Sequence, residues 1–173
     1  ISIDSKFVKA YVDRGRLFLQ MRDFERALED CSKALELNSN NPDARKCKDD
    51  ALADKTEFES TFERLTAKLK EEPNKAGTYS DRGYLYFRFH RCREAIEDYR
   101  EALEKDPKMT FGYLRRGRAY LCIKEYERAI SDLGTALSAS PNLTEAHLYI
   151  GQARFEKRDF AGAIEGYSKA LEG

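Results

Sequence analysis

The stretch TFGYLRRGRAYLCIKEYERAISDLGTALSASP, residues 110–141, has a counterpart 34 residues away on each side. One glycine, two alanines and a closing proline keep this spacing, in the series Gly83, Gly117 and Gly151; Ala95, Ala129 and Ala163; Ala102, Ala136 and Ala170; and Pro73, Pro107 and Pro141. Gly15 lies 68 residues before Gly83, which is twice the period. A period of this length indicates that one small structural unit is stacked several times.

Each copy contains two helical patterns. Tyr113, Gly117 and Tyr120 fall on one helix face. After a short polar break at residues 123–125, a second apolar series follows at helical spacing, namely Tyr126, Ile130, Leu133 and Leu137. Because the closing proline cannot continue a helix, each copy is predicted to form two antiparallel helices.

The repeated glycine stands inside the first helix of each copy, where it costs about 0.8–1 kcal/mol relative to alanine. We expect close packing to offset this cost. A helix without a side chain at Gly83, Gly117 or Gly151 lets its partner helix approach more closely than alanine would.

An arginine immediately precedes this glycine in three copies, and an aspartate follows the arginine by 16 residues. The pairs are Arg14 and Asp30, Arg82 and Asp98, and Arg116 and Asp132. In the last copy Ile150 and Gly166 replace both partners at once. We therefore predict a recurring structural contact between the two helices. If the pair is partly buried, losing one partner costs about 3–5 kcal/mol.

The glycine, the small alanines and the closing proline at a period of 34 are similar to the tetratricopeptide repeat. The resemblance covers residues 8–38, 76–107, 110–141 and 144–173. It implies an all-α, right-handed superhelical solenoid of antiparallel helix pairs, the alpha-alpha superhelix. The expected repeats are 1–41, a degenerate repeat 42–75, 76–109, 110–143 and 144–173.

The second repeat departs from the pattern, because Asp49 replaces the helix glycine. A second-helix face is kept, formed by Phe58, Phe62, Leu65 and Leu69. Thr56 and Glu59 match a capping box, which favours a helix that restarts at this point. The alternative is one longer helix from about Asp43 to Lys70.

In tetratricopeptide proteins the first helix of each unit lines a concave groove that commonly receives a peptide or a partner helix. The resemblance places the following residues there: Tyr84, Phe87, Arg88, Phe111, Leu114, Arg115, Arg118, Leu121, Leu148, Tyr149, Gln152 and Phe155. The set is unusually apolar for a surface, which is typical of an interaction site. The alternative is that some of these residues pack against neighbouring helices, since a register inferred from sequence can be wrong by one face.

Within this groove, apolar side chains would supply pockets and arginines would orient a carboxylate. The expected partner is a protein or peptide segment that is amphipathic and mildly acidic. Family members that clamp the acidic C-terminal tails of chaperones use five Lys, Asn and Arg positions, and only Arg115 matches them, so chaperone tails are not expected. The asparagine ladder of the sugar-transferring members is also missing.

No catalytic, cofactor or metal site is expected. Residues 112–121 contain two glycines five apart, but Arg118 and Ala119 stand where a phosphate-binding loop needs Lys and Ser or Thr. His90 and His147 lack metal-ligand spacing. Since His147 stands where Tyr79 and Tyr113 stand in earlier copies, it is expected to pack. The chain is predicted not to be an enzyme.

Charge argues against nucleic acid and membranes as partners. The 31 Lys and Arg balance 31 Asp and Glu, so no overall field attracts a polyanion. No apolar run is long enough to span a bilayer, and no membrane insertion is expected. Binding of RNA on a helical-repeat surface is a third functional class, and it would appear as salt-dependent retention on polyanions.

The four cysteines never form a C-x-x-C motif, and each lies in an apolar or helical context. This pattern predicts reduced, buried thiols. It also predicts a reducing, cytoplasmic location.

The final helix would leave Ile164, Tyr167 and Leu171 open on one side. Self-association through this uncapped C-terminal helix is therefore one expectation. The predicted function is a non-catalytic scaffold or adaptor that binds a peptide or amphipathic partner segment in its concave groove. The alternative is a regulatory or targeting segment of a larger multidomain protein or enzyme.

Overall fold

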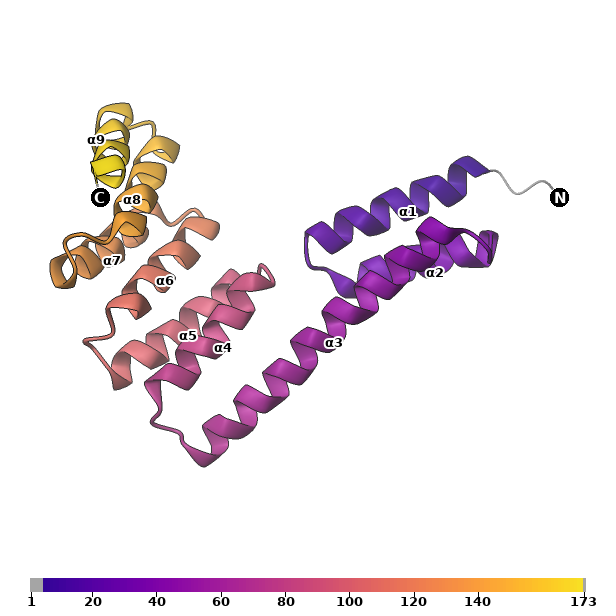
Figure 1. Ribbon diagram of the computed structural model, residues 1–173, viewed down its shortest axis with the longest axis horizontal. Coiled ribbons are helices and arrows are strands. Elements are labelled where there is room, and N and C mark those ends of the chain that lie inside the picture. The colour runs from indigo at the N-terminus through magenta and orange to yellow at the C-terminus, as the bar shows by residue number, and fades with distance from the viewer. Residues whose placement is uncertain (1–4, 173) are drawn as a thin grey trace. The chain divides into compact units, whose positions relative to one another are not determined.

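The computed structural model describes residues 5–172, and nine helices with no strand make up the regular structure of that range (Figure 1). The helices are α1 (Ser5–Gln20), α2 (Phe24–Leu37), α3 (Pro42–Glu71), α4 (Ala76–Arg88), α5 (Cys92–Lys105), α6 (Thr110–Cys122), α7 (Tyr126–Ala139), α8 (Thr144–Glu156) and α9 (Phe160–Glu172). The predicted all-α solenoid is confirmed. Residues 1–4 and Gly173, the ends of the first and fifth expected repeats, lie outside the described range.

The chain divides into two compact units whose boundary falls between Glu63 and Arg64, inside α3. In the second unit α4 packs on α5, α6 on α7 and α8 on α9, and these helix pairs lie side by side in Figure 1. Helix α5 contacts α6 and α7 contacts α8, while α4 and α8 each also contact α6. Each pair therefore packs against its neighbours along the chain, and α6 is the central first helix of the unit.

The repeated glycines lie where two helices touch, as expected. A Cβ added to Gly83 would lie 2.8 Å from Cε1 of Tyr99 and 3.2 Å from the carbonyl oxygen of Ala95. At Gly117 the nearest atoms are Cγ of Leu133 at 2.8 Å and the carbonyl oxygen of Ala129 at 3.3 Å. Because backbone is among the close atoms, alanine would force the two helices apart.

The predicted arginine–aspartate contacts are confirmed in all three copies. Arg116 donates from Nε and Nη2 to the two carboxylate oxygens of Asp132, at 2.7 and 2.9 Å. The other two pairs have the same two-pronged geometry, Arg14 with Asp30 and Arg82 with Asp98. The hydrogen bond to Asp132 raises the pKa of Arg116 above its ordinary value. Arg116 is thus a structural residue of the fold.

The last helix pair shows what replaces this ion pair. A Cβ added to Gly166 would lie 2.7 Å from the backbone nitrogen of Gly151. Where the aspartate is absent, α9 therefore packs directly against the backbone of α8. Loss of the carboxylate and closer helix contact occur together at this position.

The prediction that a helix restarts at Thr56 is wrong, and the alternative of one long helix is correct. Helix α3 runs without interruption through 30 residues. The Thr56 hydroxyl donates to the carbonyl oxygen of Leu52 at 2.8 Å, the bond of a threonine in a helix interior and not of a cap. Asp49 lies exposed, so this helix can continue without burying its carboxylate.

The prediction of four reduced thiols is also wrong. Two disulfides are present, Cys31–Cys47 between α2 and α3, and Cys92–Cys122 between α5 and α6. Their Cα atoms are 5.9 and 6.3 Å apart, within the range that a disulfide spans. Sequence separations of 16 and 30 carry no local motif, and only the stacking of helices brings the partners together.

Candidate functional site

Apart from Leu114, the predicted groove residues lie on one side of α4, α6 and α8, which we call the first-helix face. Four of its apolar side chains are largely open to solvent: Tyr84 (42%), Phe111 (60%), Leu148 (45%) and Phe155 (51%). Arg88 and Gln152 are also exposed. Half-buried positions are occupied by Phe87, Arg115, Arg118, Leu121 and Tyr149.

Leu114 does not belong to this face, and the prediction that it lines the groove is wrong. It is only 2% exposed and packs with Leu133, Ala146 and Ile150 in a core cluster. The next repeat supplies Ala146 and Ile150, so stacking of that repeat is what covers Leu114. Leu148 holds the same place one repeat later and is exposed.

Tyr84 and Phe111 are exposed for a different reason than Leu148, which lies in the last repeat of the described range. Both belong to helices that have a repeat packed against them on the C-terminal side, α4 against α6 and α6 against α8. Their side chains are nevertheless uncovered. Tyr84 and Phe111 are therefore apolar surface that the stacking of repeats does not cover.

Three arginines of α6 lie within four residues, and they have different partners. Arg116 is held by Asp132, as described above. Arg115 donates from Nη1 to the Ser80 hydroxyl at 2.9 Å, lies 3.9 Å from a carboxylate oxygen of Asp81, and stands over the Tyr84 ring at 5.2 Å. Its charge is therefore partly balanced within the first-helix face.

Arg118 is surrounded by aromatic rings instead. Its guanidinium carbon lies 5.1 Å from the centroid of Phe87 in α4 and 4.9 Å from that of Tyr149 in α8. Within residues 5–172 the Arg118 side chain makes neither a hydrogen bond nor an ion pair. Cation–π contacts of this kind hold a guanidinium in place without using its five N–H donors.

Tyr99 is the residue of this region that the sequence did not single out. It is fully buried beneath Gly83 and packs in the same cluster as Phe87. Its hydroxyl is the one buried side-chain polar atom of the described residues that lacks a hydrogen-bond partner. Burial raises its pKa, while the charges of Arg115 and Arg118 lower it, so the hydroxyl lies within electrostatic reach of both guanidinium groups.

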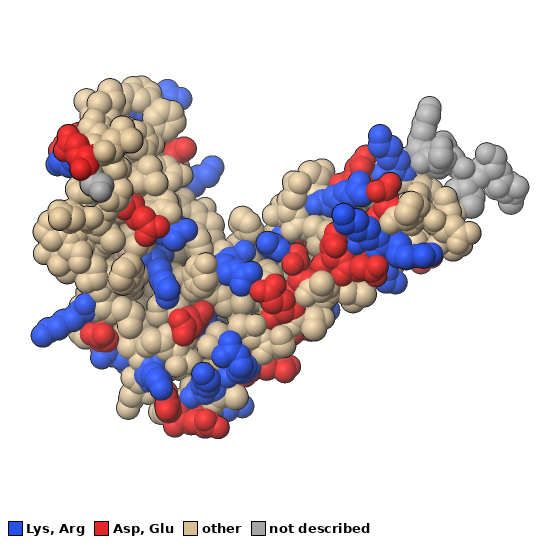
Figure 2. Space-filling model, in the orientation of Figure 1, with Lys and Arg blue, Asp and Glu red and all other residues tan. Residues whose placement is uncertain are grey.

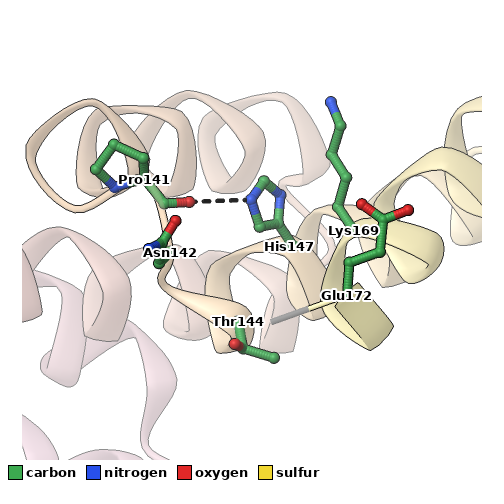
Figure 3. A pocket seen from close by; sticks show the side chains of 6 residues that line it. All are labelled: Pro141, Asn142, Thr144, His147, Lys169 and Glu172. Atoms are coloured by element: carbon green, nitrogen blue, oxygen red, sulfur yellow. Dashed lines mark hydrogen bonds between the residues drawn. The ribbon is translucent and has the colours of Figure 1, made fainter.

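A shallow cavity of about 270 Å³ lies away from these arginines, where the turn before α8 meets the end of α9 (Figure 3). Its wall includes His147, whose Nε2 lies 3.3 Å from the carbonyl oxygen of Pro141. In the preceding repeat the Tyr113 hydroxyl donates to the carbonyl oxygen of Pro107 at the same distance. His147 thus replaces a tyrosine in a repeated turn contact, in keeping with its predicted packing role.

On the face shown in Figure 2, blue Lys and Arg and red Asp and Glu side chains are interspersed. No group of three or more His, Cys, Asp or Glu side chains that could hold a metal ion occurs among the described residues. Nor does any helix of residues 5–172 have the length and apolarity needed to cross a membrane.

Comparison with known proteins gives the same repeat architecture. The chain is 29% identical over 120 residues to RNA polymerase II-associated protein 3 of Xenopus tropicalis, and this match covers 60% of the chain and 18% of that relative's length. The chain therefore spans less than a fifth of this curated relative.

Solved structures with the same fold include MamA and YrrB. The solved chain of MamA from Desulfovibrio magneticus RS-1, which runs from residue 41 to the end, superimposes with a TM-score of 0.64 at 21% identity, covering 95% of this chain and 93% of that solved chain. YrrB, described as a tetratricopeptide repeat protein with an unusual peptide-binding site, superimposes with a TM-score of 0.63 at 19% identity, covering 94% of this chain and 84% of YrrB.

Sequence models of one family match residues 8–41, 80–143 and 114–173, and these ranges together include most of the chain. They contain the helix glycines, the repeated alanines and both halves of each arginine–aspartate pair. With the stacked helix pairs of the structure, these matches establish that the chain belongs to the tetratricopeptide repeat family.

Proposed function

We propose that the chain is a non-catalytic interaction scaffold that binds a peptide or an amphipathic partner segment on the first-helix face. The observation that carries this proposal is the exposure of Tyr84 and Phe111 within a stack of packed repeats. Burial of such rings by a ligand removes apolar surface from water, which is the main favourable term in association. The fold of YrrB, a protein described as having a peptide-binding site, supports the same assignment.

Direct peptide binding tests this proposal. Peptides are selected on the intact chain from a phage-displayed random library, and their Kd values are measured by fluorescence polarisation. Phe111→Ser combined with Phe155→Ser is expected to raise Kd by about tenfold or more, because two exposed apolar contacts are lost.

Met21→Ser provides the matched control, since it removes a 60% exposed apolar side chain from the turn between α1 and α2 and not from the first-helix face. It is expected to leave Kd unchanged. Circular dichroism should report the same helix content in all variants. Equal peptide affinity in the double variant and the wild type would contradict the proposal.

A second candidate is an interaction segment that regulates or targets a longer protein. The match to 18% of the length of RNA polymerase II-associated protein 3 favours it, because in that relative the matching segment is a small part of the chain. A search of the full-length gene product for a further domain decides between the two. In either case we propose no enzyme activity within these residues and no nucleic-acid partner, so retention on heparin should be weak at physiological salt.

Self-association through α9 is part of the proposal. Ile164 and Leu171 are more than half exposed, as expected, and so is Phe160. The expectation that Tyr167 lies open on the same side is wrong, because its ring is half-buried against Gly151 of α8. Sedimentation at high concentration should reveal a dimer that Ile164→Ser weakens. A strict monomer at all concentrations would contradict it.

A cytoplasmic location is the remaining part of the proposal. The two disulfides instead favour an oxidising compartment, so the redox state of the cysteines in the cell decides between these locations. Rapid alkylation of cell extracts, followed by mass spectrometry of Cys92 and Cys122, decides it: free thiols support the cytoplasm and a disulfide contradicts it.

A further inference from the structure

The inference concerns Arg118 and rests on the proposed function of the first-helix face. Arg118 is half-buried and has aromatic rings of two different helices around it. Among the described residues, however, none accepts a hydrogen bond from it. A guanidinium that is partly removed from water without an acceptor carries a desolvation cost, and an anionic ligand would offset it.

The rings also keep the guanidinium in a fixed place. Phe87 and Tyr149 come from the helices on either side of α6, so the side chain is held across the centre of the face. An arginine that is already ordered loses little conformational entropy on binding. Its planar fork matches the two oxygens of a carboxylate.

The Tyr99 hydroxyl is a second, independent observation. It is buried, has no hydrogen-bond partner among the described residues, and interacts electrostatically with Arg115 and Arg118. Tyr99 packs in the same cluster as Phe87, the ring over which Arg118 stands, so an unsatisfied buried donor lies under this part of the face. In the rest of the fold, buried aspartates are satisfied in pairs, so this combination is not a general property of the repeats.

Charge selects the class of ligand. Arg115 is already near Asp81 and bonded to Ser80, whereas Arg118 has no hydrogen-bond or ion-pair partner among the described residues. One carboxylate balances the charge of Arg118. Exposed apolar side chains lie on both sides of α6, with Tyr84 on α4 and Phe155 on α8. A carboxylate bound between them therefore belongs to a side chain within an apolar segment.

We infer that Arg118 selects a glutamate or aspartate side chain of the bound segment, flanked on both sides by apolar residues. Phe87 and Tyr149 position the guanidinium for this contact. This assignment predicts which peptides the first-helix face prefers.

A double-mutant cycle tests the inference with the phage-selected peptides described above. Each peptide is compared with a version in which its central Glu or Asp is replaced by Gln or Asn. On the wild-type chain this replacement should raise Kd by about tenfold, as expected for loss of a charge-assisted, two-pronged hydrogen bond.

On Arg118→Gln the same peptide replacement should change Kd by less than about twofold, since the contact is already absent. Arg118→Lys keeps the charge but not the fork, and it should retain only part of the discrimination. Arg128→Gln is the control: it removes an exposed arginine of α7 that also stands over a ring, that of Tyr120, and it should discriminate as the wild type does.

The outcomes separate the two proposals. If the selected peptides lose affinity on Phe111→Ser with Phe155→Ser, but lack an acidic preference or discriminate equally on Arg118→Gln, the role of Arg118 is wrong and the binding face stands. If no peptide is selected, or if the selected peptides ignore the phenylalanine changes, the proposed function fails and this inference fails with it.

Discussion

At the scale of single residues, α6 illustrates how position within a repeat decides the role of a side chain. Arg115, Arg116 and Arg118 are chemically identical and lie within four residues. Arg116 points to the partner helix and closes an ion pair with Asp132. Arg115 and Arg118 lie on the other side of the helix, among rings and polar groups of neighbouring repeats. Of these roles, only the ion pair made by Arg116 recurs at the repeat period.

Substitutions of Arg116 and Asp132 should have strongly non-additive effects on the free energy of unfolding. Arg116→Ile leaves the Asp132 carboxylate, 9% exposed, without its partner, and should lower the free energy of unfolding by about 3 kcal/mol. Adding Asp132→Gly reproduces the Ile150 and Gly166 combination of the last repeat and should recover part of this loss. Urea denaturation of the four members of the cycle measures the coupling. Additive effects would show that the two side chains act independently.

Tyr99→Phe should stabilise the fold. The change removes a buried hydroxyl that has no partner within residues 5–172 and keeps the ring that packs under Gly83. Relief from an unsatisfied polar group is worth about 1 kcal/mol. The midpoint of urea unfolding should rise, and the half-buried Tyr167→Phe serves as control. A lower midpoint would mean that the hydroxyl has a stabilising partner in solution.

At the scale of elements, α3 marks the limit of local sequence signals. Thr56 and Glu59 satisfy the spacing of a capping box. This pattern marks the start of a helix only where the residues before it are not themselves helical. Ala44, Cys47 and Ala51 are buried at helical spacing before it and hold the first part of α3 against its unit. Leu65 and Leu69 do the same in the second unit. Tertiary packing at both ends therefore overrides the local signal in the middle.

Thr56→Ala distinguishes a helix interior from a cap. In one continuous helix the change removes a weak side-chain bond to Leu52 and introduces a better helix former, so α3 should be stabilised by a few tenths of a kcal/mol. At a true cap the same change would cost about 1 kcal/mol. Amide hydrogen exchange along residues 52–60 measures the difference. Faster exchange in the variant would restore the two-helix interpretation.

Asp23 is a true cap and should behave oppositely. It precedes α2 and accepts from the backbone N–H of Arg26 at 3.1 Å. Hydrogen bonds from the Arg26 side chain and backbone lower the pKa of this carboxyl. Because the folded pKa lies below the unfolded one, the stabilisation is present above about pH 4 and is lost as pH falls through the folded value.

Asp23→Ala should therefore cost about 1 kcal/mol near neutral pH and almost nothing in strong acid. Hydrogen exchange of α2 amides, measured against pH, follows the loss. Asp23→Asn, which keeps an acceptor but not the charge, should reduce the pH dependence while preserving most of the cap. A cost that does not change with pH would rule out the charged form as the stabilising species.

At the scale of the whole molecule, the repeat period predicted the stacked helix pairs, the close contacts at glycine and the ion pairs between helices. Each of these recurs at fixed spacing, so one copy supports the interpretation of another. Features that occur once were missed or misplaced. The disulfides depend on helix stacking between cysteines of different repeats, and Leu114 is buried by residues of the following repeat. The Arg118 environment likewise requires side chains from three repeats.

The disulfides should be the most easily tested of these features. Without reductant, the unfolded chain should contain no reactive thiol among its four cysteines. Breaking Cys92–Cys122, which closes a loop with a sequence separation of 30, should lower the stability of the second unit by about 3 kcal/mol. Cys92→Ala with Cys122→Ala, compared in urea with the wild type, measures this loss. Four reactive thiols in the untreated protein would contradict the bonded state.

Because each repeat packs only against its neighbours, the fold is modular. The first-helix face is not modular to the same degree. A duplicate of residues 110–143 inserted after residue 143 would find the same helix contacts on both sides and should lengthen the solenoid without disturbing it. The duplication would, however, place Phe87 beside one copy of the arginine and Tyr149 beside the other. The architecture can be extended by whole units, whereas the aromatic enclosure of Arg118 exists only in the present order of three particular repeats.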